Sequence, residues 1–335
     1  MSKVRSFCAA IALFAGMSAA HAADTVKFGS LRVPMQLFVG IDKGFFAEED
    51  IAIKPVFFKS GAEIAPAVAT GQVDAALTTS GAALFNAMAR GIEMKIVAEG
   101  LSLEPNAPGG DPSGVVVRKA LHDSGEVKGP EGLKGRTLAS TAPGQILDQI
   151  LRTYLAKGGV EASEVKFVAM PLPDMLPALS TGAIDGAMII EPFMSMATEQ
   201  GLGVVLATAS EIMPNATQAF IMFGNQMMEN RQLGVRFLKA YLKTNSWLRE
   251  VLPTKAGRAE VAAIYQKYVP AQSEDTYRHI ALGTASADAT VKVDGEFGLQ
   301  WQLDQLRAQG VINGDPKLAD YVDGSLLAEA LKGRE

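Results

Sequence analysis

The chain has 335 residues, of which 48% are hydrophobic, so it is long enough to bury the cores of about two globular domains. Its formal net charge is −5 and its basic residues form no stripe, which excludes nucleic acid and anionic membranes as expected partners. A single cysteine, Cys8, excludes an internal disulfide.

The first 22 residues have the pattern of a secretory signal peptide. Lys3 and Arg5 form a basic region, an apolar run covers residues 7–20, and AHA at 20–22 is a small-x-small cleavage site. We expect cleavage after Ala22 and export to the periplasm. A membrane anchor is the weaker alternative, because the apolar run is shorter than the roughly 20 residues that span a bilayer. Cleavage removes the cysteine and takes the net charge from −5 to −7, which leaves no thiol for catalysis or metal binding.

Residues 26–207 alternate between strand and helix patterns in two similar halves. Strands are expected at 26–30, 53–58, 74–78 and 94–98, and then at 136–140, 165–170, 185–190 and 203–207. Helices are expected at 36–48, 62–70 and 81–90, and then at 144–157, 174–181 and 192–200. The fold class is therefore α/β, with two lobes that each contain a mainly parallel sheet flanked by helices.

A repeat supports two lobes of the same design. AVATGQVDAALTTS at 67–80 and ALSTGAIDGAMIIE at 178–191 share five identities in fourteen positions. The repeat length, above 100 residues, is that of a whole lobe and not of a solenoid unit.

Two segments are expected to cross between the lobes, GVVVRK at 114–119 and AFIMF at 219–223. Helices are then expected at 227–252, 255–268, 273–282, 296–309 and 325–332. We assign residues 23–112 plus 208–335 to the first lobe and residues 113–207 to the second.

The repeat also nominates a binding crevice, since ligands of parallel α/β sheets bind beyond the carboxyl ends of the strands. Ser80 and Glu191 occupy equivalent positions there, although each could be only a helix cap. The same argument nominates further ligand-binding residues: Met35, Gln36, Ser60, Gly61, Thr79, Thr141 and Gln145. Arg32, in the first crevice loop, is the one candidate partner for an anion.

Several motifs in order, among them DKGFFAEEDI, ATGQVDAALTTS, GLKGRTLA and STGAIDGAMIIEPF, resemble solute-binding proteins of nitrate/sulfonate/taurine-type ABC importers. That superfamily also contains binders of thiamine-pyrimidine precursors. The resemblance covers residues 24–224. It implies a type II-like periplasmic-binding-protein fold that closes on a small molecule and delivers it to an inner-membrane permease with a cytoplasmic ATPase. Glu191-Pro192 matches an acidic-Pro pair common in the family.

Chemistry of other kinds has little support in the sequence. His122 and His279 are isolated, and no nucleophile elbow, Walker loop or dinucleotide fingerprint is present, so we expect no metal, no cofactor and no catalysis. We expect a monomer that binds an organic solute, sulfonate-like or heterocyclic and aromatic. Two alternatives stay open: an enzyme on the same fold, of lyase or pyrimidine-synthase type, and an exported ligand sensor.

Overall fold

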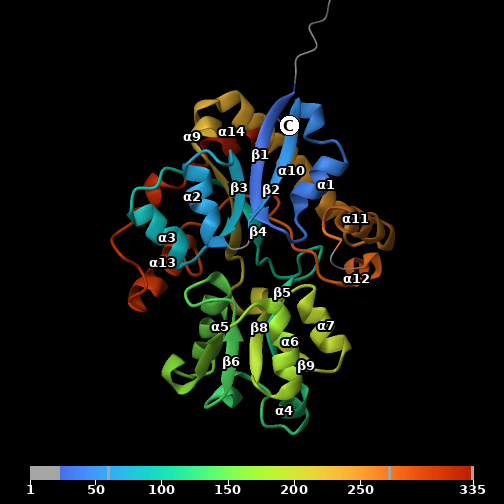
Figure 1. Cartoon of the computed structure of the whole chain (residues 1–335), viewed down its shortest axis with the longest axis vertical. Helices are drawn as coiled ribbons and strands as arrows, with labels where there is room; N and C mark the ends of the chain where they lie inside the picture. Colours follow the sequence, from blue (N-terminus) through green and yellow to red (C-terminus); the bar gives the residue numbers. More distant parts are fainter. Residues whose placement is uncertain (1–22, 59–60, 271–272, 333–335) are drawn as a thin grey trace, which may run out of the picture.

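The computed structural model describes residues 23–58, 61–270 and 273–332. The expected signal peptide and Ser60 lie outside these ranges. Two lobes lie one above the other along the long axis of the molecule (Figure 1). We call the lobe that contains the N-terminal strand lobe 1 and the other lobe 2.

The sheet of lobe 1 has the strand order β2-β1-β3-β10-β4. Its strands are β1 (Asp24–Leu31), β2 (Ile51–Phe58), β3 (Ala75–Thr79), β4 (Lys95–Ser102) and β10 (Thr217–Phe223). β1 pairs in parallel with β2 and β3, whereas β10 runs antiparallel to both β3 and β4. The second expected crossing segment is therefore the antiparallel strand of this sheet.

The sheet of lobe 2 repeats this plan with the order β7-β6-β8-β5-β9. Its strands are β5 (Ser113–Arg118), β6 (Thr137–Ser140), β7 (Lys166–Ala169), β8 (Gly186–Ile190) and β9 (Gly203–Thr208). β5 is antiparallel to β8 and β9, and β6 is parallel to β7 and β8. Each sheet thus contains one antiparallel strand, β10 or β5, among four strands that run in the same direction, and the expected two-lobed, mainly parallel architecture is confirmed.

Helices cover the sheets and form the C-terminal region. The helices of the two halves are α1 (Gln36–Asp42), α2 (Ile64–Ala69), α3 (Ala82–Ala89), α4 (Lys119–Asp123), α5 (Ile146–Lys157), α6 (Leu172–Thr181), α7 (Phe193–Glu199) and α8 (Ala209–Ile212). The C-terminal helices are α9 (Asn225–Glu229), α10 (Arg231–Val251), α11 (Lys255–Tyr268), α12 (Glu274–His279), α13 (Leu299–Ala308) and α14 (Ser325–Lys332). In the described part of the chain, no helix combines the length and apolar character needed to cross a membrane.

The first expected helix is too long. The sequence predicts a helix over 36–48, but α1 ends at Asp42, and a separate 3-10 turn covers Ala47–Glu49. Gly44 lies between them with φ +76°, a left-handed conformation that glycine adopts without steric cost and that ends a helix.

The threonine and glycine of the repeat close equivalent helices in the two lobes. The hydroxyls of Thr70 and Thr181 each donate to the carbonyl four residues earlier, at 3.0 Å. Gly71 and Gly182 follow with φ +70° and +76°, the left-handed turn that ends α2 and α6. These repeated residues are therefore explained by local structure.

The aspartate of the repeat then fixes the next strand. Asp74 Oδ2 accepts the backbone N–H of Lys27 at 2.7 Å, and Asp185 Oδ2 accepts that of Thr137 at 2.9 Å. Each carboxylate thus satisfies an N–H of the neighbouring strand at the amino end of the sheet. The same hydrogen bond occurs in both lobes, which explains why the aspartate has the same position in both copies of the repeat.

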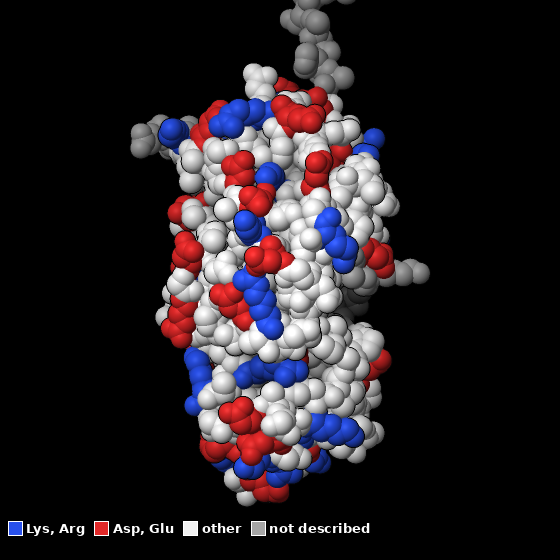
Figure 2. Space-filling view, turned by 90° about the vertical axis from the view of Figure 1, so that its left-hand side faces the viewer, with Lys and Arg blue, Asp and Glu red and all other residues white. Residues whose placement is uncertain are grey.

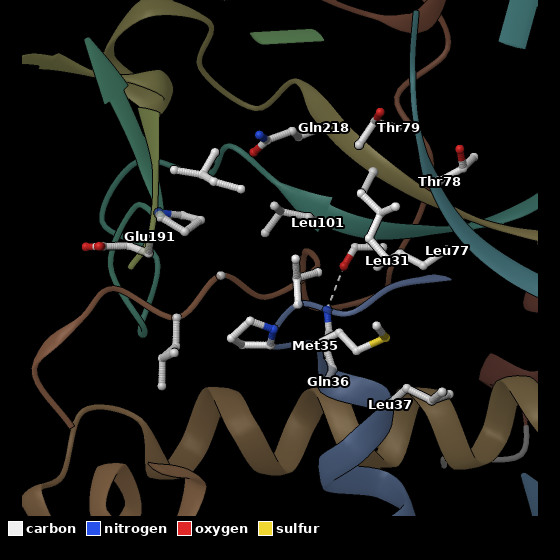
Figure 3. Close-up of a pocket in the computed structure, with 18 of the residues that line it drawn as sticks. Leu31, Met35, Gln36, Leu37, Leu77, Thr78, Thr79, Leu101, Glu191 and Gln218 are labelled. Carbon is white, nitrogen blue, oxygen red and sulfur yellow. Dashed lines mark hydrogen bonds between the residues drawn. The ribbon is translucent and has the colours of Figure 1, made fainter. Parts of the chain in front are cut away.

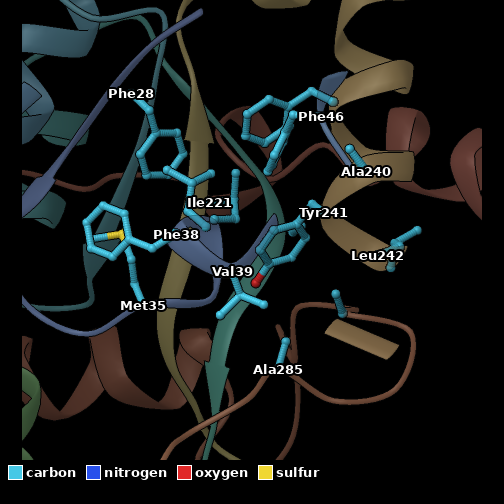
Figure 4. Packing of buried hydrophobic residues seen from close by; sticks show 14 of the residues in the cluster. Phe28, Met35, Phe38, Val39, Phe46, Ile221, Ala240, Tyr241, Leu242 and Ala285 are labelled. Atoms are coloured by element: carbon cyan, nitrogen blue, oxygen red, sulfur yellow. The ribbon is translucent and has the colours of Figure 1, made fainter. Parts of the chain in front are cut away.

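The core of lobe 1 forms around α10. Phe237 stacks with Phe28 at 6.0 Å between ring centroids and packs against Phe46 and Phe223 at 5.2 and 5.4 Å. Figure 4 shows part of this cluster, with Phe28, Phe46 and Tyr241. Burying such large aromatic side chains supplies a major stabilising contribution in a core. The long C-terminal helix α10 therefore packs in the core of lobe 1.

Residues 280–298, which we call the tail segment, connect α12 with α13 and run along the lobe junction. In this segment, the backbone N–H of Leu282 donates to the carbonyl of Gly109 at 3.0 Å, and the carbonyl of Ala289 accepts from the backbone N–H of Glu99 at 2.7 Å. Phe297 at its end packs in the core of lobe 2. The tail segment therefore contacts both lobes. The residue boundaries of the two lobes stay a prediction. α8 lies just beyond residue 207, where the predicted second lobe ends, but it packs on the core of lobe 2.

Candidate functional site

An interlobe pocket of about 220 Å³ lies at the carboxyl ends of the lobe 1 strands (Figure 3). Lobe 1 and the tail segment supply most of its walls, and Pro112, Ile190 and Glu191 close it from the junction and lobe 2. The lining includes Leu31, Val33, Pro34, Met35, Gln36, Leu37, Gly61, Leu77, Thr78, Thr79, Leu101, Gln218, Tyr241, Ile280 and Leu282. The pocket is where the topology of parallel strands predicts a ligand site.

Met35 and Gln36 reach the pocket because the chain leaves β1 and turns at Pro34 into α1. Met35 has the extended backbone of an N-cap, with φ −149°, and Gln36 is the first helical residue. The Gln36 amide nitrogen donates to the carbonyl of Gly100 at 2.7 Å, which fixes which way the amide faces. Its Oε1 then has no partner among the described residues, although the side chain is only 5% exposed.

The opposite side of the pocket carries Thr78, Thr79 and Gln218 (Figure 3). The two threonines end β3, and Gln218 is the second residue of β10 beside them, since Ala219 pairs with Thr79. Gln218 is 5% exposed, and its Oε1 also has no partner among the described residues. Sequence reasoning did not nominate Thr78 or Gln218. The only signal for Gln218 was its place directly before the second expected crossing segment, 219–223.

Glu191 lines the pocket, but its carboxylate is directed away from it (Figure 3). The carboxylate accepts the N–H and the hydroxyl of Ser195 at 3.0 and 2.8 Å, which ties down the first turn of α7. It also accepts the N–H of Ala281 in the tail segment at 3.3 Å. Burial raises the pKa of Glu191 above its usual 4.5, against the lowering effect of these hydrogen bonds. Glu191 therefore links lobe 2 to the tail segment.

Ser80, the position equivalent to Glu191, does not line the pocket. Its side chain is fully buried, and its hydroxyl donates to Oε1 of Gln302 in α13. The Gln302 amide in turn donates to the carbonyl of Phe297 at 3.0 Å. Like Glu191, Ser80 is thus bonded to the C-terminal region.

Gln145 lies where the two lobes touch. Gly81 and Gln145 form an isolated antiparallel bridge, and the N–H of Ala82 donates to the Gly144 carbonyl at 2.9 Å. A Cβ on Gly81 would lie 3.0 Å from the Gly144 carbonyl oxygen and 3.2 Å from Gln145 Cα, so this close approach of the two backbones favours glycine. Gln145 also lines a cavity of about 20 Å³ beside Thr78 and Thr79.

Of the remaining candidate residues, only Gly61 is found in the described lining of the interlobe pocket. Gly61 lines the interlobe pocket, and Thr141 lies in the turn before α5, outside the pocket lining. Ser60 lies outside the described residues. Arg32 is exposed, with its guanidinium carbon 3.9 Å from the centroid of the Phe57 ring, and it does not line the pocket.

Charge is scarce in the pocket wall. Among the described lining residues, Glu191 is the one with a formal charge. Across the described part of the chain, no group of three or more His, Cys, Asp or Glu side chains could hold a metal ion. On the outer face in Figure 2, acidic and basic side chains are interspersed, without a continuous basic stripe.

The fold and the interlobe pocket define a two-lobed binding-protein architecture. The family model of the NMT1-like family matches residues 22–266, and the chain belongs to this family.

Two curated relatives match parts of the chain. It is 35% identical over 77 residues to the nitrate import ATP-binding protein NrtC of Synechocystis, which covers 23% of this chain and 12% of that protein. It is 26% identical over 131 residues to the nitrate/nitrite binding protein NrtA of Nostoc, covering 38% and 30%. The chain thus matches less than a third of the length of either relative.

Solved structures share the fold over most of the chain. The nitrate-binding protein NrtA of Synechocystis superposes with a TM-score of 0.74 at 15% identity, covering 93% of this chain and 89% of that one. The alkanesulfonate-binding protein SsuA of Xanthomonas axonopodis, bound to MOPS, gives 0.67 at 17% identity, covering 91% and 99%. A mutant of the desulfurization enzyme DszB with biphenyl-2-sulfinic acid gives 0.63 at 13% identity, covering 93% and 100%. The resemblance drawn from the sequence is confirmed at the level of fold and family.

Proposed function

We propose that the chain is the periplasmic substrate-binding subunit of an ABC importer, which captures a small organic solute in the interlobe pocket. The observation that carries this proposal is the position of the pocket, whose walls come from lobe 1, lobe 2 and the tail segment. A ligand there contacts both lobes at once, so its binding favours the state in which the lobes are closed.

The partners follow from this function. The bound protein delivers its solute to an inner-membrane permease with a cytoplasmic ATPase, and it works as a monomer. The partial likeness to NrtC and NrtA supports an importer. The signal-peptide pattern of residues 1–22 supports a periplasmic location.

Ligand-induced closure is the test of this function. Residues 23–335 are measured by small-angle scattering and thermal unfolding against alkanesulfonates, taurine, nitrate, pyrimidines, flavins and aromatic carboxylates, amides and alcohols. A ligand at about 100 times its Kd adds roughly 2.7 kcal/mol to the unfolding free energy, and closure reduces the radius of gyration. A ligand that stabilises the protein without changing its radius of gyration contradicts closure.

The alternative is an enzyme on this fold, which the likeness to DszB favours. Among the described lining residues, only Glu191 has a carboxylate, and both of its oxygens already accept hydrogen bonds. A free general base is therefore not evident in the pocket. Mass spectrometry of each panel compound after incubation with the protein tests this alternative, and a product formed in stoichiometric excess over protein supports the enzyme.

A further inference from the structure

Aliphatic side chains that the fold leaves partly exposed gather in the interlobe pocket. They come from three strands of lobe 1, from the turn after β1 and from the end of β8 in lobe 2: Leu31, Leu77, Leu101, Val33 and Ile190. Figure 3 shows Leu31, Leu77 and Leu101 together in the pocket. Single exposed aliphatic side chains are common on protein surfaces, but a group of them in one hollow marks a binding site. These walls therefore offer a ligand mainly apolar surface.

The polar side chains of the lining are largely engaged within the protein. The amide nitrogen of Gln36 and the hydroxyl of Tyr241 donate to backbone carbonyls at 2.7 and 2.9 Å. The carboxylate of Glu191 is directed away from the pocket and accepts hydrogen bonds from α7 (Figure 3). Among the described lining residues, Thr79 is the one other polar residue that is partly exposed. Apolar contact is therefore the main interaction that these walls can make with a ligand.

Ile190 carries this apolar surface into lobe 2. It is the last residue of β8, it packs against the core of lobe 2, and it is partly exposed. Because the neighbouring Glu191 carboxylate is directed elsewhere, Ile190 supplies the apolar contact from lobe 2. Burial of apolar surface is favourable in proportion to its area, so an apolar group between Ile190 and the leucines of lobe 1 favours the closed arrangement.

The volume of the pocket limits how large this apolar group can be. The interlobe pocket encloses about 220 Å³, whereas an aliphatic cavity of roughly 150 Å³ binds benzene in a well-studied lysozyme variant. By proportion, the interlobe pocket holds a ligand of roughly nine non-hydrogen atoms. A single ring or a short alkyl chain with a small head group has this size.

Resting on the proposed function, we propose that the pocket takes the apolar body of its ligand, a ring or a short alkyl chain, and that Ile190 of lobe 2 closes on this body against the leucines of lobe 1. Affinity and closure then depend on the apolar size of the ligand. The gain for each added methylene is the same for a neutral and for an anionic head group, because the apolar body and not the head group contacts these walls.

Two homologous series of probes test this ligand class. Straight-chain alcohols from ethanol to decanol and alkanesulfonates from methane- to octanesulfonate are titrated into residues 23–335 by saturation-transfer NMR and calorimetry. We expect affinity to rise about fourfold per methylene in both series, and the heat capacity of binding to become more negative with each step. The gain should end at roughly nine non-hydrogen atoms, near octanol and pentanesulfonate. Affinity that does not rise with chain length in either series overturns the proposal.

Substitutions of Ile190 test the contact from lobe 2. Ile190→Ala should weaken hexanol binding about tenfold, and the milder Ile190→Val two- to fourfold, because each removes apolar surface from the wall. Ile53→Ala is the matched control, since Ile53 is also a partly exposed strand isoleucine packed against a core but lies outside the described pocket lining. It should leave hexanol affinity unchanged even where the melting midpoint falls. Unchanged affinity in both Ile190 variants overturns the assignment to Ile190.

The outcomes also separate this inference from the proposed function. Closure on nitrate or taurine in the scattering experiment, with no rise of affinity along either series, retains the importer subunit and overturns the apolar ligand class. If no compound of the panel or of the two series binds or closes the lobes, both are overturned. Closure that becomes more complete from ethanol to hexanol supports both.

Discussion

Replacing Glu191 by alanine tests whether this residue holds lobe 2 to the tail segment. The substitution removes the acceptors for the N–H and hydroxyl of Ser195 and for the N–H of Ala281. Loss of a helix-capping side chain costs about 1 kcal/mol, and loss of one further hydrogen bond about 0.5–1.5 kcal/mol. We therefore expect Glu191→Ala to lower the unfolding free energy by about 2 kcal/mol, or the melting temperature by about 4 °C.

The cost should also depend on pH. Burial raises the pKa of Glu191 above 4.5, so the folded protein holds the proton to higher pH than the unfolded chain. The stabilising contribution of Glu191 is then complete below pH 4.5 and decreases as pH rises through the folded pKa. The difference between wild type and Glu191→Ala should accordingly be larger in mildly acidic buffer than above neutral pH.

Urea unfolding at several pH values measures both effects, and Glu199→Ala provides the matched control. Glu199 is an exposed carboxylate at the last position of the same helix, where a negative charge opposes the helix dipole. Its removal should change the unfolding free energy by less than about 0.5 kcal/mol. The reasoning is refuted if Glu191→Ala costs no more than Glu199→Ala, or if its cost grows as pH rises.

Three further substitutions test other parts of the structure. Gly81→Ala should weaken ligand binding about tenfold, because its Cβ would lie 3.0 Å from the Gly144 carbonyl oxygen and keep the lobes apart. Calorimetric titration checks this, with Gly324→Ala, in open space, as control. Asp74→Ala should lower the unfolding free energy, measured in urea, by about 2 kcal/mol, because it leaves the Lys27 N–H unpaired. A loss below about 0.5 kcal/mol would contradict a stabilising role for this hydrogen bond. Burial raises the pKa of Glu99 from 4.5, so the unfolding free energy of the wild type should fall as pH rises above this value. Glu99→Gln should make the unfolding free energy less dependent on pH. An equally steep pH profile in this variant would show that another group is responsible.

The sequence predicts the elements of this fold well, because short apolar runs between turn residues define strands in a covered sheet. The strand expected at 185–190 is β8 (Gly186–Ile190), and the helix expected at 255–268 is α11 with the same bounds. The end of α1 was predicted too late, because its apolar pattern continues through Phe45 and Phe46 while Gly44 already turns the backbone.

The pocket lining was predicted only in part. Met35, Gln36, Gly61, Thr79 and Glu191 line it, and each was found by its place after a strand. Tyr241 and Leu282 could not be found in this way, because they reach the pocket through the packing of C-terminal segments whose docking no local pattern encodes. The orientation of Glu191 was equally hidden, since its partner Ala281 is 90 residues away.

The two equivalent strand ends show how the repeated halves have come to differ. Ser80 in lobe 1 is bonded to Gln302, and Glu191 in lobe 2 is bonded to Ala281, so both positions are bound by the C-terminal region. This region lies beyond the repeat, and by holding both strand ends it can favour one relative placement of the lobes. Gln36 and Gln218 line the pocket instead, at the start of α1 and near the start of β10. If the binding proposal is correct, substitutions at 36 and 218 change ligand choice, whereas substitutions at 80 and 191 change lobe closure and stability.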